Sequence, residues 1–228
     1  MNTTAICDLF ERQVQAFTSA PEFAALEAAG AGYETVIENV ARTHLKSPQL
    51  VAFLYALAPP SAATNLLDNL REELGLESPS DRPHPALLED LLAAAGLGHR
   101  LAAIRAQAEN DLRRLVTEPL LYGTLRDVGL AALTEIVAFE FMLSRVAGRI
   151  ARALALHCAL PAPALEWFTH HSEVDVRHAE QGIANLAAYA DYYGFDDEEA
   201  LTIIEMTLRE NVFTRRYFRD AHPGDARR

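Results

Sequence analysis

Apolar residues recur every three or four positions along most of this chain of 228 residues. This spacing places them on one face of an α-helix, and no stretch alternates convincingly in the way that a half-buried β-strand does. Proline, glycine and short polar runs separate the periodic stretches. The pattern predicts helices over about residues 6–17, 21–40, 48–57, 61–73, 84–96, 98–116, 124–156, 164–193 and 197–219. We therefore expect an all-α fold of about seven to nine helices, with the second run open to a break between Gly30 and Gly32.

The stretch from about residue 124 to 156 is rich in alanine and apolar on most of its sides. A helix of this kind is expected in the centre of a bundle rather than on its surface. No repeat or low-complexity linker divides the chain, so we expect a single domain over residues 1–222. Residues 223–228, which begin at Pro223, are expected to form a frayed C-terminal tail.

The net charge of −12 at pH 7 argues against nucleic acid or an anionic membrane as a partner. No apolar run approaches the roughly 18 residues of a membrane-spanning helix, and the first residues lack the basic and apolar regions of a signal peptide. Cys7 and Cys158 match neither a disulfide framework nor a zinc-binding spacing. We therefore expect a soluble protein of the reducing cytoplasm.

One short segment, residues 170–178, groups side chains that bind metals. An α-helix turns about 100° per residue, so His171, Asp175 and His178 fall within an arc of about 60°. Trp167 and Phe168 occupy the preceding turn and favour burial, where polar groups need partners. A divalent cation would serve all three side chains; the alternatives are a solvated stripe and a set of hydrogen-bonded core histidines.

A further carboxylate lies in the most apolar part of the chain. Glu140 follows Val137, Ala138 and Phe139, and a carboxylate there must be paired, protonated or bound to a metal. Glu135 is about 140° away around the same helix, so the two glutamates do not share a face. One of them is expected to be a ligand, and an exposed glutamate remains the alternative for either.

Glu73 and His84 flank the proline-containing loop at residues 77–83, which can fold two helix ends towards one point. Glu72 competes with Glu73, and spacing does not separate them. The other histidines without a carboxylate partner at helical spacing are interpreted as structural or surface residues; they are His44, His99, His157 and His222.

The ordered set of these residues resembles one known family. The segment Asn69–Gly75, His84-Pro85, Glu140 and the spacing His171-x3-Asp175-x2-His178 together resemble the haem-oxygenase-like diiron oxidases, relatives of thiaminase II and of pyrroloquinoline quinone synthase. The resemblance covers about residues 20–215. It implies a single-domain haem-oxygenase-like helical bundle. It also implies that the ligands of two Fe(II) ions are Glu73, His84, Glu140, His171, Asp175 and His178.

The resemblance implies an O₂-dependent oxidoreductase of specialised metabolism. Such an enzyme would oxidise a small amine-, amino-acid- or fatty-acid-type substrate by N-oxygenation, desaturation or oxidative C–C cleavage, with an external electron donor. Two alternatives stay open: a metal-free thiaminase-like enzyme, and a non-enzymatic iron-binding helical protein. The sequence does not determine the oligomeric state, and a homodimer is one candidate.

Side chains one turn from the expected ligands are candidates for the substrate pocket, with ordinary core packing as the alternative for each. They are Val137, Leu143 and Ser144 near Glu140, and Trp167, Phe168 and Val174 near His171. They predict a mostly apolar cavity but do not distinguish a fatty acid from an amino acid.

Overall fold

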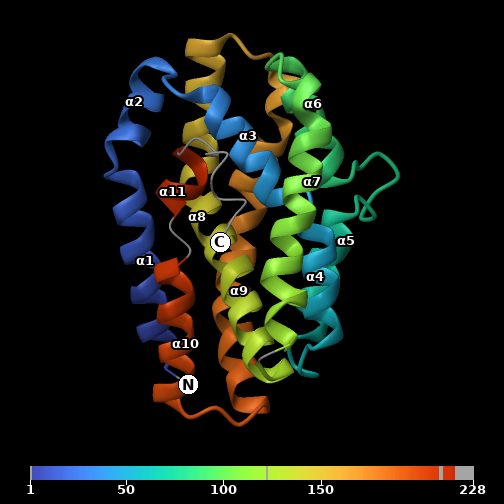
Figure 1. Cartoon of the computed structure of the whole chain (residues 1–228), viewed down its shortest axis with the longest axis vertical. Coiled ribbons are helices and arrows are strands. Elements are labelled where there is room, and N and C mark those ends of the chain that lie inside the picture. The colour runs from blue at the N-terminus through green and yellow to red at the C-terminus, as the bar shows by residue number, and fades with distance from the viewer. Residues whose placement is uncertain (1, 122, 211–212, 219–228) are drawn as a thin grey trace.

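A computed structural model describes residues 2–121, 123–210 and 213–218. These residues form a bundle of helices (Figure 1), and no β-strand occurs among them. The helices are α1 (Thr3–Thr18), α2 (Pro21–Ala29), α3 (Tyr33–His44), α4 (Ser47–Ala56), α5 (Ala63–Glu73), α6 (His84–Ala94), α7 (Leu101–Leu112), α8 (Leu125–Cys158), α9 (Glu166–Tyr192), α10 (Asp197–Glu210) and α11 (Phe213–Phe218). Short 3₁₀ segments lie at Gly98–Arg100, Pro119–Leu121 and Ala162–Leu165, and a π-helical segment lies at Arg113–Thr117. The all-α prediction is confirmed.

The run predicted over residues 21–40 is divided at two glycines. Gly30 and Gly32 have positive φ angles of 66° and 73°, at which an L side chain is strained. A Cβ on Gly30 would also lie 2.8 Å from the Cβ of His157. The described residues include eleven helical stretches instead of about seven to nine, because of this division and because α10 and α11 are described on either side of residues 211–212, which lie outside the described residues.

The predicted central helix is α8. Its residues 132–143 are all buried, and among the described helices α8 and α9 have the most extensive mutual packing. Gly182 of α9 permits this approach, because a Cβ there would lie 2.8 Å from the side chain of Val137. Figure 1 shows α1, α2, α10 and α11 on one side of this pair and α4, α5 and α6 on the other.

Buried apolar side chains from α1 to α11 form one continuous cluster around the α8–α9 pair. None of the described helices is long and apolar enough to cross a membrane. The expected domain end at residue 222 and the frayed tail at 223–228 lie outside the described residues.

Candidate metal centre

Glu73 and His84 approach each other because the loop between α5 and α6 doubles back. Glu73 is the last residue of α5 and His84 the first of α6. Gly75 turns the chain with a φ of 64°, and a Cβ there would lie 2.5 Å from the carbonyl carbon of Arg82. The two helix ends consequently meet, with Nδ1 of His84 3.4 Å from Oε2 of Glu73.

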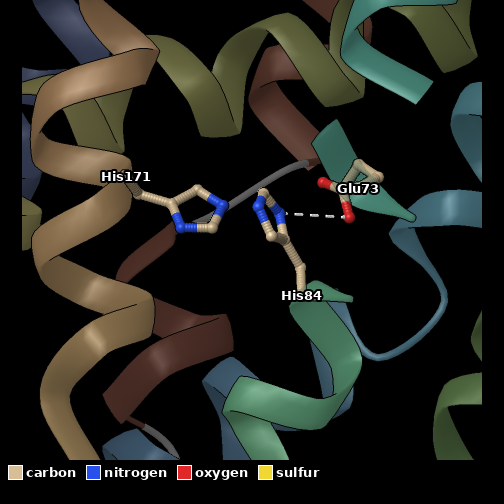
Figure 2. Close-up of side chains that lie close together, drawn as sticks. All are labelled: Glu73, His84 and His171. Atoms are coloured by element: carbon tan, nitrogen blue, oxygen red, sulfur yellow. Dashed lines mark ion pairs between the residues drawn. The ribbon is translucent and has the colours of Figure 1, made fainter. Parts of the chain in front are cut away.

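His171 of α9 completes a group with these two residues. One donor atom from each of Glu73, His84 and His171 lies within 4.8 Å of the others, and all three residues are buried. Figure 2 shows the His84 ring between Glu73 and His171. A carboxylate and two imidazoles at this separation can share one transition-metal ion.

The three other expected ligands face the same cavity. Glu140 of α8 and Asp175 and His178 of α9 line it together with Glu73, His84 and His171. The rest of the wall is formed by His44, Asn69, Ile136, Phe139 and Leu143. The cavity is small, with a volume of about 20 Å³. The structure thus brings all six expected ligands to one place.

The sequence left open whether Glu72 or Glu73, and whether Glu135 or Glu140, is a ligand, and the structure places the two members of each pair differently. Glu72 is buried, but it contacts Nε2 of His178 at 2.8 Å and pairs with Arg177 instead of lining the cavity. Glu135 is also buried and contacts Arg216 at 3.3 Å. Glu73 and Glu140 are therefore the members of each pair that face the cavity.

A buried polar atom of one expected ligand lacks a partner that a metal ion would supply. Oδ2 of Asp175 is buried and makes no hydrogen bond to any residue that the structure describes. A buried polar atom without a partner destabilises the fold, and such atoms are rare in native proteins. Coordination to a cation would satisfy this atom.

Backbone and side-chain hydrogen bonds orient three of the expected ligands. Nδ1 of His171 donates to the carbonyl oxygen of Trp167 at 2.7 Å, which leaves Nε2 for coordination. The Ser47 hydroxyl donates to Glu73 at 2.5 Å, and the Asn69 amide donates to Glu140 at 2.5 Å. Such supports fix ligand orientation and raise metal affinity.

Protonation differs between the parts of the cavity. Burial lowers the pKa of His171 well below its usual value, and nearby His84 lowers it further, so this ring is neutral. Burial raises the pKa of Asp175 to about 8. Burial opposes a charge on His178, but hydrogen bonding to Asp175 and Glu72 outweighs it and raises the pKa to about 10. A metal would therefore displace protons from the Asp175–His178 pair.

Sequence reasoning missed three residues at this site. His44, interpreted as structural or surface, is buried and lines the cavity. Asn69 lies one helical turn before Glu73, a spacing that could have identified it as a supporting residue. Ser47 reaches Glu73 from α4, and nothing in its sequence context indicates that contact.

The candidate substrate residues are divided between the cavity and the core. Leu143 lines the metal cavity, and Val137 lines an adjoining one that shares Asn69, Glu140 and His178. Four carboxamides face that second cavity, contributed by Asn65, Asn69, Gln181 and Asn185. The others are absent from both described walls: Ser144, Trp167, Phe168 and Val174.

Comparison with protein families supports the resemblance seen in the sequence. Residues 34–209 match the model of a family described as iron-containing redox enzymes. A comparison with curated proteins finds no match. The chain belongs to this haem-oxygenase-like family, because the match spans well over half of its length. Iron and oxidoreductase chemistry are thus properties of the family, and the buried Glu73, His84 and His171 group is in keeping with them.

Proposed function

We propose that this protein is a non-haem diiron oxidase or oxygenase that uses O₂ to oxidise a small molecule. The observation that carries the proposal is one cavity lined by three carboxylates and four imidazoles, among which are all six expected ligands. Mixed carboxylate and imidazole ligands suit Fe(II). Membership in a family of iron-containing redox enzymes supports the same metal.

The six side chains divide into two groups that would hold one iron each. Glu73, His84 and His171 already lie within 4.8 Å of one another through their donor atoms. Glu140, Asp175 and His178 line the remaining part of the cavity. Two Fe(II) ions there would supply the electrons that activate O₂, and the protein would supply position and orientation.

The apolar part of the wall limits water beside the ligands. Ile136, Phe139 and Leu143 of α8 are buried and face the cavity between polar side chains. Water exclusion strengthens electrostatic interactions and prevents side reactions of oxidised species. This environment suits oxidation of an unactivated carbon or an amine nitrogen.

The substrate class remains an amine, an amino acid or a fatty acid, and the proposed reactions are N-oxygenation, desaturation and oxidative C–C cleavage. An external electron donor would restore the ferrous state where the substrate does not supply all electrons. We propose a role in specialised metabolism in the cytoplasm, with no nucleic acid or membrane as partner.

Iron content and O₂ uptake test the proposal together. Protein loaded anaerobically with Fe(II) and freed of excess metal should retain about two irons per chain and consume O₂ after mixing with air. A metal-free enzyme would retain none, and a simple iron-binding protein would retain iron without consuming O₂. Either result would refute the diiron assignment.

A further inference from the structure

A phenol and an imidazole lie hydrogen-bonded beside the cavity, and neither is an expected ligand. Oη of Tyr217 on α11 is 2.6 Å from Nε2 of His44 on α3. Both side chains are buried, with 2% and 5% of their surface exposed. His44 itself lines the metal cavity, so Tyr217 is separated from that cavity by a single residue.

Aromatic rings connect this pair to an expected ligand. The Trp167 ring lies 4.1 Å from the His171 ring and 5.0 Å from the His44 ring, measured between centroids. The Tyr217 and His44 rings are nearly parallel, with an angle of 16° and centroids 6.2 Å apart. Electronic coupling falls steeply with distance, so rings this close can exchange an electron readily.

The surroundings keep both members of the pair uncharged. Burial lowers the pKa of His44 to about 3, so its imidazole is neutral and one ring nitrogen can accept a hydrogen bond. Burial raises the pKa of Tyr217, so the phenolate is not formed at neutral pH. A buried phenol of this kind can lose an electron only when its proton has a base to move to.

We propose that Tyr217 and His44 form a redox-active pair that gives one electron to the oxidised metal centre. The Tyr217 O–H bond breaks, the electron passes to the metal centre, and the proton moves along the hydrogen bond to Nε2 of His44. The products are a neutral tyrosyl radical, an imidazolium on His44 and a metal centre reduced by one electron. This assignment rests on the proposed function, because iron oxidised by O₂ is the electron acceptor.

Two other tyrosines show why the pairing matters. The hydroxyl of Tyr189, a residue only 1% exposed, donates to the backbone carbonyl of Arg126 at 3.2 Å. The hydroxyl of Tyr193 donates to the carbonyl of Leu57 at 2.8 Å. A peptide carbonyl is too weak a base to take the phenolic proton. Tyr189 is therefore a matched control: a buried, hydrogen-bonded tyrosine without a basic partner.

The test is freeze-quench electron paramagnetic resonance on Fe(II)-loaded full-length protein mixed with O₂ in the absence of substrate. Protein labelled with ring-deuterated tyrosine identifies a tyrosyl signal by its narrowed hyperfine pattern. The variants are Tyr217→Phe, His44→Gln and the control Tyr189→Phe. Iron content, O₂ uptake and circular dichroism are measured on every sample, so a folding or loading defect is recognised directly.

We expect a tyrosyl radical in the wild type and in Tyr189→Phe, and none in Tyr217→Phe with two irons retained. Formation of the tyrosyl radical in the wild type should slow in D₂O, because the proton moves with the electron. Radical formation should also be at least about tenfold slower in His44→Gln. A tyrosyl signal that persists in Tyr217→Phe would overturn the assignment. Iron binding and O₂ uptake without any tyrosyl radical in the wild type would overturn it too, and would leave the proposed function standing. Failure to bind iron or to consume O₂ would overturn both the radical assignment and the proposed function. The iron content and O₂ uptake measured on every sample identify this outcome.

Discussion

The two groups of expected ligands differ in how ready they are for a metal. In the Glu73–His84–His171 group, donor atoms already lie within 4.8 Å of one another, and Ser47 and the Trp167 carbonyl orient two of the side chains. In the Glu140–Asp175–His178 group, Nε2 of His178 contacts Glu72 at 2.8 Å and Nδ1 lies 3.5 Å from Asp175. In the first group Nδ1 of His84 also pairs with Glu73, at 3.4 Å, but both partners are expected ligands. The first group is therefore preorganised, whereas in the second group Nε2 of His178 is held by Glu72, which does not line the cavity.

This difference implies an order of metal binding. The first group needs little movement. His171 is already neutral. Burial opposes a charge on His84, but Glu73 outweighs it and raises the pKa of His84, so this group has one proton to release. The second group must release protons, and His178 must leave Glu72 to offer Nε2 to a metal. Rearrangement and proton release both subtract from binding free energy. We therefore expect the Glu73–His84–His171 group to fill first and to bind iron more tightly.

Removal of a single ligand should change iron content and activity more than any other substitution, and it tests whether the two groups differ in metal affinity. His178→Ala should abolish turnover, retain about one iron instead of about two, and leave helical circular dichroism nearly unchanged. His84→Ala should lose more iron than His178→Ala, because it damages the group that fills first. Iron analysis after anaerobic loading measures this, with the exposed His157→Ala as a matched control.

The expected order of metal binding would be wrong if His84→Ala kept one iron and His178→Ala kept none. Full activity of His178→Ala with the native substrate would show instead that the metal site is misplaced altogether.

The two glutamates of α8 should differ by a smaller margin in iron content but clearly in activity. Glu140→Ala removes a side chain from the cavity wall, so iron in the second group should fall and turnover should be lost. Glu135→Ala removes a contact to Arg216, and should retain iron and most activity. Turnover and iron content are measured in both variants. A larger loss in Glu135→Ala than in Glu140→Ala would identify Glu135 as the ligand.

The sequence predicts the helices well because their apolar spacing and their prolines and glycines are local signals. The loop between α5 and α6 was likewise recognisable, since its composition predicts a reversal that brings Glu73 towards His84. The spacing of His171, Asp175 and His178 on one face followed from helix geometry alone.

What the sequence could not show are contacts between distant elements. Glu72 and Glu73 are adjacent in the chain, and only the packing of α5 against α9 directs one towards His178 and the other into the cavity. Ser47 and His44 meet the site across helix interfaces, with no periodic signal to reveal them. Trp167 and Phe168, chosen by proximity to His171, are buried in the core and lie outside both described cavity walls.

Removal of the hydrogen bonds that support the ligands should weaken iron binding more modestly, and in each group separately. Ser47→Ala frees Glu73 in the first group, and Asn69→Leu frees Glu140 in the second. Loss of such a support typically weakens metal binding by about 10- to 100-fold. An anaerobic Fe(II) titration should show a weaker first step in Ser47→Ala and a weaker second step in Asn69→Leu. Identical titration curves in the two variants would show that the groups do not bind independently.

The smallest expected effect is a change of local stability in α9. This helix carries His171, Asp175 and His178, and without metal its buried Oδ2 of Asp175 has no hydrogen-bond partner in the part of the chain that the structure describes. Three carboxylates around one cavity also repel each other when ionised, which favours local opening. Fe(II) binds the closed site better than an opened one, so it should raise the melting temperature and slow hydrogen exchange across residues 166–185. Residues 132–143 of α8, fully buried, serve as the internal reference. Equal protection of α9 with and without Fe(II) would mean that the second group is as preformed as the first, and the difference between the two groups would then have no consequence for folding.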